Sequence, residues 1–241
     1  MSQAELLTAS GVVKKFGGFT ALGGVDFVLH RNERVGLIGP NGSGKSTFVN
    51  CLSGVLGIDQ GTIRFDGDAI ETLPSWRRAR AGIARSFQVP RPFKGSTVRE
   101  NVEIPLMFAA GVHDRARLAD QAQAILDLLG MGHLALKSPS RLSQVELRKL
   151  ELGRAMAVRP RVLIADEAMA GLSDSEVDEI VDLLFAFNEQ GIAIILIEHL
   201  MRAVTRFSER LVVLVAGAKI ADGDPGEVMS HPEVVRAYLG E

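Results

Sequence analysis

The sequence predicts an α/β fold with a mostly parallel sheet, and three observations support this class. Beyond Pro160, short apolar segments alternate with longer amphipathic ones, which is the order of strands and helices in such a fold. A glycine-rich loop, Gly39–Thr47, joins an apolar run to a helical segment. The 241 residues, 46% hydrophobic and 23% charged, suffice for one large domain of ordinary globular composition.

The N-terminal part of the chain predicts strands joined by tight turns. Leu6–Val13 and Val25–Leu29 have strand patterns, and the Gly17-Gly18 turn lies between them. Gly61–Gly67 is a strand that ends in an Asp-Gly turn, which indicates antiparallel pairing. Ile83–Phe87 is a further strand. We therefore expect an antiparallel β part beside the parallel sheet.

The middle of the chain predicts helices, from about Thr97 to Val158. Thr97 and Glu100 have the spacing of a capping box, and a helical period follows in Leu118–Leu129. Later strands are expected at 162–165, 192–197 and 211–215, and helices at 175–187 and 200–207. We expect a single domain: a core in 1–90 and 160–223, an inserted helical subdomain in 91–159 and a helical tail in 224–241.

Composition excludes several classes of protein. The net charge of −2 does not favour a dedicated binder of nucleic acid or anionic lipid. The longest apolar runs, such as Ile192–Ile197, are too short to cross a bilayer, and the N-terminus has no secretory signal. The single cysteine, Cys51, is expected to be a buried structural thiol. We expect a cytosolic chain.

The glycine-rich loop predicts binding of a nucleoside triphosphate. Glycines at these positions let successive backbone N–H groups point inward around an anion, and the following helix adds its N-terminal dipole. Lys45 can reach the outer phosphates, and the Ser46 hydroxyl can ligate Mg²⁺. The predicted nucleotide-binding residues of the loop are Gly39, Asn41, Gly42, Ser43, Gly44, Lys45, Ser46 and Thr47.

Polar side chains at the ends of three predicted strands complete this site. Asp166 and Glu167 follow an apolar strand: Asp166 can hold Mg²⁺, while Glu167 can polarise an attacking water. His199, after the next strand, can sense the γ-phosphate, and Gln88 offers an amide to both metal and water. The alternatives are that the two acids only cap a helix and that His199 is an ordinary surface residue.

The order of these motifs resembles the ATP-binding subunits of ABC transporters over essentially the whole chain. Within that family, four segments resemble the branched-chain amino-acid uptake group: Gly39–Gly42, Arg85–Gln88, Ala170–Leu172 and Ile197–His199, together with the ending 235–241. The resemblance implies a P-loop NTPase core that hydrolyses Mg²⁺-ATP. It also implies that Phe16 stacks on adenine; Phe16 could equally be a core residue, and Phe19 is the neighbouring candidate.

The resemblance places a signature segment at Leu142–Glu146, which would act on the ATP of a partner subunit. Ser143 is retained, but Val145 replaces a glycine and Glu146 replaces glutamine. A β-branched residue restricts the backbone and covers its N–H. Ser143 and Glu146 also have capping-box spacing, so Glu146 can fold back onto Ser143. We expect a weakened signature; the alternative is that Ser143 simply caps a helix and glutamate is tolerated.

The resemblance also implies the partners. Two membrane permease subunits, a second ATPase in a head-to-tail homo- or heterodimer and, indirectly, a solute-binding protein are expected, at the cytoplasmic face of the cell membrane. Residues Gln88–Asn101 resemble the region that cups a membrane subunit's helix. The expected solute is a branched-chain or other hydrophobic amino acid. Alternatives are urea, amides, aromatic acids or lipopolysaccharide, or a low-turnover ATPase in a non-transport system such as DNA repair or the ribosome.

Several polar and charged residues outside these motifs are expected to have roles other than catalysis. Arg77, Arg78, Arg80 and Arg85 form a basic cluster that is expected to be a solvated face and not a nucleic-acid patch. The resemblance implies that Ser173 and Asp174 lie in a segment that contacts the partner across the dimer; Asp174 is also a candidate N-cap of the helix that follows it, and both roles can hold together. The remaining histidines (His30, His113, His133 and His231) lack metal-ligand spacing.

Overall fold

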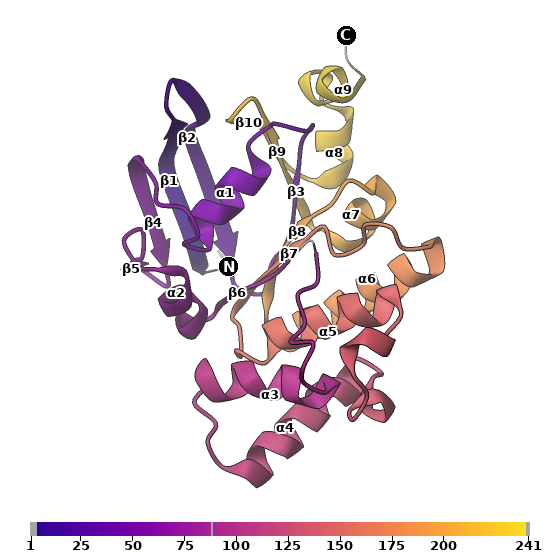
Figure 1. Ribbon diagram of the computed structural model, residues 1–241. Coiled ribbons are helices and arrows are strands. Elements are labelled where there is room, and N and C mark those ends of the chain that lie inside the picture. The colour runs from indigo at the N-terminus through magenta and orange to yellow at the C-terminus, as the bar shows by residue number, and fades with distance from the viewer. Residues whose placement is uncertain (1–3, 88, 240–241) are drawn as a thin grey trace.

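Two sheets organise the fold in a computed structural model that describes residues 4–87 and 89–239 (Figure 1). The larger sheet has six strands in the order β10-β9-β3-β8-β7-β6, and all neighbours are parallel except β10 with β9. Its strands are β3 (Arg34–Ile38), β6 (Ile83–Ser86), β7 (Val162–Asp166), β8 (Ala193–Ile197), β9 (Arg210–Val215) and β10 (Ala218–Gly223). The predicted fold class is confirmed.

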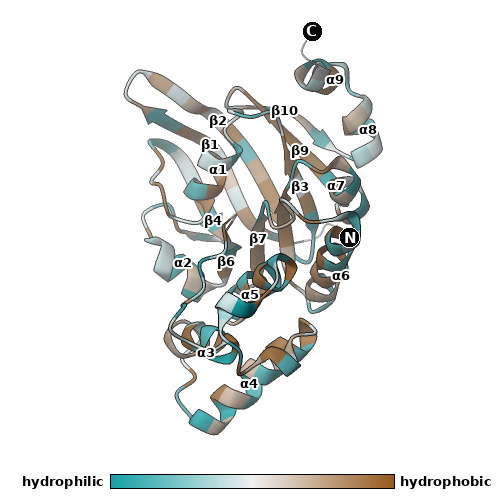
Figure 2. Ribbon diagram, turned by 45° about the vertical axis from the view of Figure 1, so that its right-hand side comes forward, coloured by the Kyte–Doolittle hydropathy of each residue, from teal (hydrophilic) through white to brown (hydrophobic). Residues whose placement is uncertain are grey.

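The central strands are buried on both faces, so their side chains divide between two cores. Val162 and Ile164 of β7 join the core beneath helix α1 (Lys45–Leu52), whereas Leu163 and Ala165 join the core of the helical part. This alternation is the period of two of a strand, and it explains why β7 and β8 are continuous apolar runs. Figure 2 shows these strands as hydrophobic ribbons between more polar helices.

The smaller sheet is antiparallel and has the order β2-β1-β4-β5. Its strands are β1 (Glu5–Phe16), β2 (Phe19–His30), β4 (Gln60–Phe65) and β5 (Asp68–Ala69). Both predicted turns are present: Gly17-Gly18 joins β1 to β2, and Asp66-Gly67 joins β4 to β5 with positive φ at both residues. The antiparallel β part predicted from the sequence is thus confirmed.

The helices between β6 and β7 lie together below the larger sheet in Figure 1. They are α3 (Val98–Phe108), α4 (Arg115–Leu128) and α5 (Gln144–Met156). The predicted capping box starts α3: the Thr97 hydroxyl accepts from the Glu100 N–H at 3.2 Å, and the Glu100 carboxylate accepts from the Thr97 N–H at 2.6 Å. Throughout 4–87 and 89–239, every helix falls short of the length and apolarity needed to span a bilayer.

The remaining helices flank the later strands and end the described chain. They are α2 (Ser75–Ala81), α6 (Asp174–Glu189), α7 (Met201–Phe207), α8 (Pro225–Ser230) and α9 (Pro232–Leu239). The prediction that Asp174 caps α6 is wrong, because Ser173 holds the extended cap position and Asp174 is already helical. The Glu176 carboxylate accepts from the Ser173 N–H at 2.8 Å, which fixes the helix start one residue earlier.

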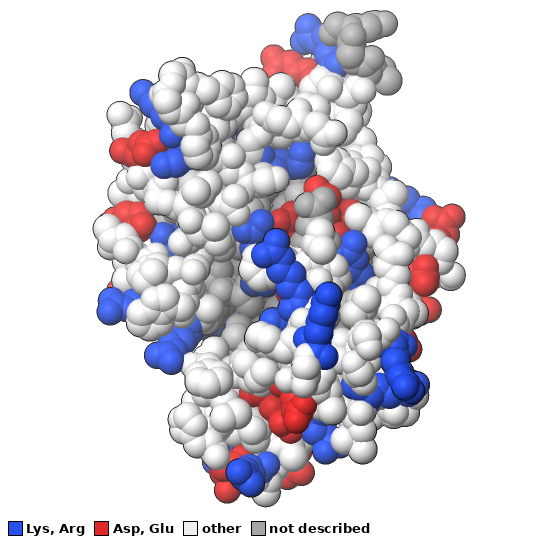
Figure 3. All heavy atoms as spheres, in the orientation of Figure 1, with Lys and Arg blue, Asp and Glu red and all other residues white. Residues whose placement is uncertain are grey.

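The expected solvated face of arginines is wrong for two of its members. Arg78 is only 1% exposed, and its guanidinium donates to the carbonyls of Cys51 and Leu52 at 2.7 and 2.9 Å. It also donates to the carbonyls of Leu73 and Glu71. Burial lowers the pKa of Arg78. Arg85 is a residue of β6, and its side chain is only 13% exposed because it pairs with Asp166. On the face seen in Figure 3, basic side chains are interspersed with acidic ones.

Replacing Arg78 by alanine is expected to lower the free energy of unfolding by about 3 kcal/mol, because several buried carbonyls lose their donor together. Chemical denaturation of the purified protein measures this loss. The matched control is Arg77→Ala, since Arg77 is exposed and lies 5.1 Å from the centre of the Trp76 ring. Equal small effects of both variants would show that Arg78 does not tie α2 to the end of α1.

Candidate active site

The glycine-rich loop connects β3 to α1, and its backbone requires glycine at two points. Gly39 has a φ of 151°, and a Cβ there would lie 2.1 Å from the Leu214 carbonyl oxygen. Gly44 has a φ of 101°, and its Cβ would lie 2.8 Å from the Ala21 carbonyl oxygen. Any side chain at either position would push the loop off the strands beneath it. These strands therefore hold the loop in the shape that exposes its N–H groups at the start of α1.

The Lys45 side chain folds along this loop. Its Nζ atom donates to the carbonyl oxygens of Gly39 and Pro40 at 2.7 and 3.1 Å. Burial lowers the pKa of Lys45, while the charges of Glu167 and Asp166 act in the opposite direction. The ammonium is thus held within the loop, beside two carboxylates, at the position from which it can meet a phosphate oxygen.

A cavity of about 270 Å³ opens above the loop and brings most of the predicted residues together. It is lined by Phe19, Ala21, the whole loop from Asn41 to Thr47, Glu167 and His199. Gly39 lies at the turn that enters the loop. Phe16 is 48% exposed, so the alternative that it belongs to the core is wrong. Phe19 lines the cavity directly, and Phe16 lies across the β1–β2 turn from it.

Glu167 and His199 meet because the strands before them are neighbours. Asp166 of β7 pairs with Ile197 of β8, so the residues that follow both strands emerge at the same edge of the sheet. The Glu167 Oε1 atom lies 3.2 Å from Nε2 of His199. Glu167 has a φ of 47°, an uncommon value for a residue with a side chain, and its N–H donates to the Ile197 carbonyl at 2.9 Å. Such local strain is typical of functional positions.

Asp166 and Ser46 line a second cavity, next to the first, together with Asn50 and Arg85. Mg²⁺ prefers oxygen ligands and is usually held by one or two carboxylates plus the phosphates of a substrate, so this donor set fits the ion. Within the described ranges, no three His, Cys, Asp or Glu side chains gather as a complete metal site. Gln88, the third predicted ligand, lies outside the described residues.

Two residues of this region were missed by sequence reasoning, and Glu198 is the first. It is 3% exposed and accepts from the Met169 N–H at 2.8 Å, so it ties the end of β8 to the segment after Glu167. Burial raises the pKa of Glu198 to about 7, and the nearby Glu167 adds to the effect. Hydrogen bonds from the Met169 and His199 N–H groups and the charge of Arg148 oppose it. The only signal in the sequence was an acid at the end of an apolar strand.

Glu198 makes stability depend on pH. The ordinary pKa of a glutamate is 4.5, whereas Glu198 in the fold titrates near 7, so between these values the folded chain holds one more proton than the unfolded chain. Raising the pH therefore favours unfolding. Relative to Glu198→Gln, wild type is expected to lose about 2 kcal/mol of stability between about pH 5 and about pH 8. Denaturation of both proteins across this range tests it, and parallel curves would contradict it.

The second missed residue is Arg85, whose guanidinium lies beside Asp166. Its Nη2 atom is 2.6 Å from Oδ2 of Asp166, and its Nη1 atom donates to Oδ1 of Asn50 at 2.6 Å. In the sequence Arg85 lies just before Gln88, and nothing there indicates that it reaches a carboxylate 81 positions away. The Asp166 carboxylate, a predicted Mg²⁺ ligand, is therefore paired with a cation of the chain itself.

The signature segment starts α5 and has the predicted capping box. The Glu146 carboxylate accepts from the Ser143 N–H at 2.7 Å, and the Ser143 hydroxyl accepts from the Glu146 N–H at 3.3 Å. Val145 packs partly against the core of the helical part. None of these three residues is part of the described lining of the phosphate-loop cavity. The first turns of α5 are instead joined to the segment after Glu167, since Gln144 and Arg148 both donate to the Ala170 carbonyl.

Comparison with known proteins agrees with this geometry. A family model described as ABC transporter matches residues 22–170, and one described as branched-chain amino acid ATP-binding cassette transporter matches residues 218–241. The chain is 36% identical, over 98% of both chains, to the high-affinity branched-chain amino acid transport ATP-binding protein BraF of Pseudomonas aeruginosa.

Two similar solved structures are described with a bound nucleotide or in a nucleotide-defined conformation. The ADP conformation of an ATP-binding cassette of an ABC transporter superposes with a TM-score of 0.88 at 30% identity, covering 99% of this chain and 100% of that one. A dimeric cassette in a post-hydrolysis state, bound to ADP and Pi, gives a TM-score of 0.82 at 25% identity, covering 91% and 99%. The likeness therefore extends over the loop, the later strands and the helical part.

Proposed function

The chain belongs to the ABC transporter family of ATP-binding cassettes, and we propose that it energises the uptake of branched-chain or other hydrophobic amino acids. It is an ATPase that binds nucleotide. The observation that supports the solute class is the match of residues 218–241 to the branched-chain cassette model. Within the chain we infer the division made above: a core in 1–90 and 160–223, a helical signature subdomain in 91–159 and a tail in 224–241.

The proposed mechanism assigns each side chain at the cavity a task. The N–H groups of the loop and the Lys45 ammonium bind the β- and γ-phosphates, and Phe16 or Phe19 offers a ring to adenine. Glu167 accepts a proton from the attacking water, and His199, 3.2 Å away, orients Glu167 and approaches the γ-phosphate. Ser46, Asp166 and Gln88 would hold Mg²⁺, which when bound supplies positive charge against the phosphates. Positioning and neutralisation of charge account for most of the catalysis of phosphoryl transfer.

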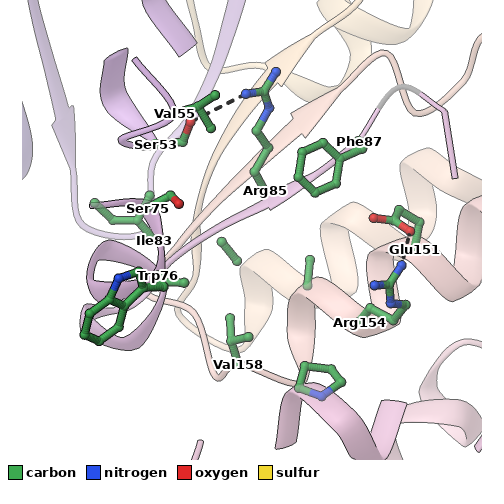
Figure 4. A pocket seen from close by; sticks show the side chains of 14 residues that line it. Ser53, Val55, Ser75, Trp76, Ile83, Arg85, Phe87, Glu151, Arg154 and Val158 are labelled. Carbon is green, nitrogen blue, oxygen red and sulfur yellow. Dashed lines mark hydrogen bonds and ion pairs between the residues drawn. The ribbon is translucent and has the colours of Figure 1, made fainter. Parts of the chain in front are cut away.

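The proposed assembly is a head-to-tail pair of ATPases beneath two permease subunits, at the cytoplasmic face of the cell membrane. Because Ser143, Val145 and Glu146 are not in the lining of the chain's own phosphate cavity, the signature is free to face the nucleotide of a partner. A groove of about 300 Å³ between α2, α3 and α5 offers Trp76, Phe87, Pro105 and Arg154 to a helix of a membrane subunit (Figure 4). The solute-binding protein would contact only the permeases.

Cross-linking tests the transport assignment. Val89 is 64% exposed and Phe93 is 42% exposed, and both follow Phe87, which comes directly after β6 and lines the groove. Cysteines placed at these two positions are expected to cross-link to an integral membrane protein in native membranes. A cysteine at the exposed Leu136, on the helical part, is the control. Failure to cross-link, together with stimulation of hydrolysis by DNA or ribosomes, would favour a non-transport ATPase.

The solute itself is tested with the complete transporter. Purified complex in vesicles is expected to accumulate leucine or isoleucine when ATP is supplied on the side of the ATPase. Uptake of urea, short amides or aromatic acids in place of these amino acids would assign the chain to another uptake group. Export of lipopolysaccharide would show that the transporter is an exporter and not an importer.

Val145→Gly is expected to raise hydrolysis about tenfold at the site that uses this chain's signature, because one more backbone N–H can approach the γ-phosphate. The other composite site, built on this phosphate loop, should not change. Each site is measured alone by removing the phosphate-loop lysine of the opposite subunit; Lys45→Ala serves for this chain. Full and equal activity of the unmodified chain as a homodimer would contradict the weakened signature.

A further inference from the structure

Arg85 is held at the metal carboxylate by two anchors on different elements. One arm of the guanidinium contacts Asp166 at the end of β7, and the other contacts Asn50 on α1. Nη1 also lies 3.5 Å from the Ser53 hydroxyl (Figure 4). The side chains of Arg85 and Asp166 are only 13% and 9% exposed, so water screens their attraction weakly. The ion pair is therefore a stable feature of the edge of the sheet where the metal is expected.

The same side chain forms a wall of two cavities. Arg85 and Phe87 line the cavity that contains Ser46 and Asp166, and both also line the groove that contains Trp76 and Pro105. The Arg85 guanidinium lies 5.7 Å from the centre of the Phe87 ring. A movement of this guanidinium away from Asp166 would change the groove, because Arg85 lies between the two spaces with Val55 and Phe87, which also line both.

A guanidinium and a divalent cation cannot share one carboxylate without repulsion. The Arg85 guanidinium occupies an oxygen of the Asp166 carboxylate, and its positive charge repels an incoming cation. Competition dominates here, because the pair is mostly buried and Arg85 has a second anchor at Asn50 that keeps it in place.

We propose that Arg85 is a positioning residue that holds Asp166 in place of the cation, yields it when Mg²⁺ binds with nucleotide, and then moves toward the groove. This proposal rests on the proposed function of Asp166 as a metal ligand. It gives the groove a direct link to the metal, made of one side chain on β6.

A Mg²⁺ titration of the nucleotide-bound chain distinguishes the proposed role of Arg85 from a merely structural one. The purified chain is first saturated with a fluorescent N-methylanthraniloyl ADP in EDTA. Mg²⁺ is then titrated, and the change in the fluorescence of the bound nucleotide gives the half-maximal Mg²⁺ concentration. Arg85→Ala is expected to lower the half-maximal Mg²⁺ concentration at least about tenfold, the lower end of what one adjacent charge does to a carboxylate. Arg85→Lys should shift it less, because lysine keeps the charge but cannot bridge Asn50 and Asp166 at once. Affinity in EDTA should stay within about twofold.

The control removes an Arg–Asp pair elsewhere. Arg161, directly before β7, pairs at 2.9 Å with Asp66 in the β4–β5 turn, and Arg161→Ala should leave the Mg²⁺ titration unchanged. If Arg85→Ala does not fold, Asn50→Ala decides the matter, since it removes the second anchor and should shift the titration in the same direction. An unchanged or higher Mg²⁺ requirement in the folded variants would overturn the proposal, whereas a wild type without nucleotide affinity would overturn the proposed function as well.

Trp76 supplies a second readout, because it is the only tryptophan of the chain and lines the groove with Arg85. In wild type, adding Mg²⁺ to the ADP-bound chain is expected to shift the emission of Trp76. Arg85→Ala should lose at least about half of that shift while it still binds Mg²⁺. An equal shift in both proteins would show that the groove does not sense the metal through Arg85.

Discussion

Lys45→Ala is expected to lower kcat/KM for ATP by about 10³-fold or more, since the variant loses both a phosphate ligand in the ground state and a charge in the transition state. The Lys45 ammonium is buried within the loop and donates to the Gly39 and Pro40 carbonyls, which holds it where the phosphates are proposed to bind. No other lysine lines the phosphate-loop cavity in the described part of the chain. Steady-state hydrolysis and binding of a fluorescent ATP both measure the loss.

Lys137→Ala is the matched control, because Lys137 is exposed on the helical part and should leave both values unchanged. The unfolding free energy of Lys45→Ala should stay close to that of wild type, since within the described residues the Lys45 ammonium donates to carbonyls of its own loop and to the Ser43 hydroxyl, not to another element. If the nucleotide affinity of Lys45→Ala stayed within about threefold of wild type, the glycine-rich loop would not be the phosphate-binding site, and the proposed function would be wrong.

Local patterns predicted most of the fold. The strands β3, β7, β8 and β9 are continuous apolar runs bounded by turn residues or charges, so their positions follow from the sequence to within one or two residues. The turns at Gly17-Gly18 and Asp66-Gly67 and the capping box of α3 depend only on neighbouring residues. The conformation of such turns and caps is determined by a few adjacent residues, so it can be predicted from the local sequence.

The elements that were missed have weak local signals. Helix α2 is short and mostly exposed, and three of its seven residues are arginines, so no apolar stripe marked it. Strand β10 pairs only along one edge and has no fully buried residue, which gave it no apolar run. The start of α6 was misplaced because Ser173 and Asp174 are both good caps, and the position of Glu176 decides between them only once its contact is known.

The site was predicted where its residues follow strands and was missed where contacts join distant segments. Glu167 and His199 were placed together because parallel strands end at a common edge. The pair of Arg85 with Asp166 and the hydrogen bond that the Met169 N–H donates to Glu198 depend on side-chain directions across the sheet. No periodicity encodes these contacts, and each acid or base in the sequence had many alternative partners.

The contacts of Ala170 join two parts of the site that were predicted separately. Gln144 and Arg148 of α5 donate to its carbonyl, at 3.3 and 3.2 Å, only three residues after Glu167. A Cβ on Gly171 would lie 2.8 Å from Nε2 of Gln144, so the two segments are closely packed. A shift of the signature helix, as expected when a partner's nucleotide binds, would therefore move the segment that carries Glu167, the proposed general base.

Glu167→Gln is expected to lower kcat about 10³-fold, within the range of 10²–10⁴ for loss of a general base, while nucleotide affinity stays near that of wild type. Glutamine keeps the size of the side chain and can still accept a hydrogen bond from His199, but it cannot take a proton from water. Single-turnover hydrolysis and equilibrium binding separate the two effects. Glu179→Gln, which alters an exposed acid paired with Lys149, is the control. Hydrolysis by Glu167→Gln within about tenfold of wild type would assign the base to another group, and the unusual φ of 47° at Glu167 would then need a different explanation.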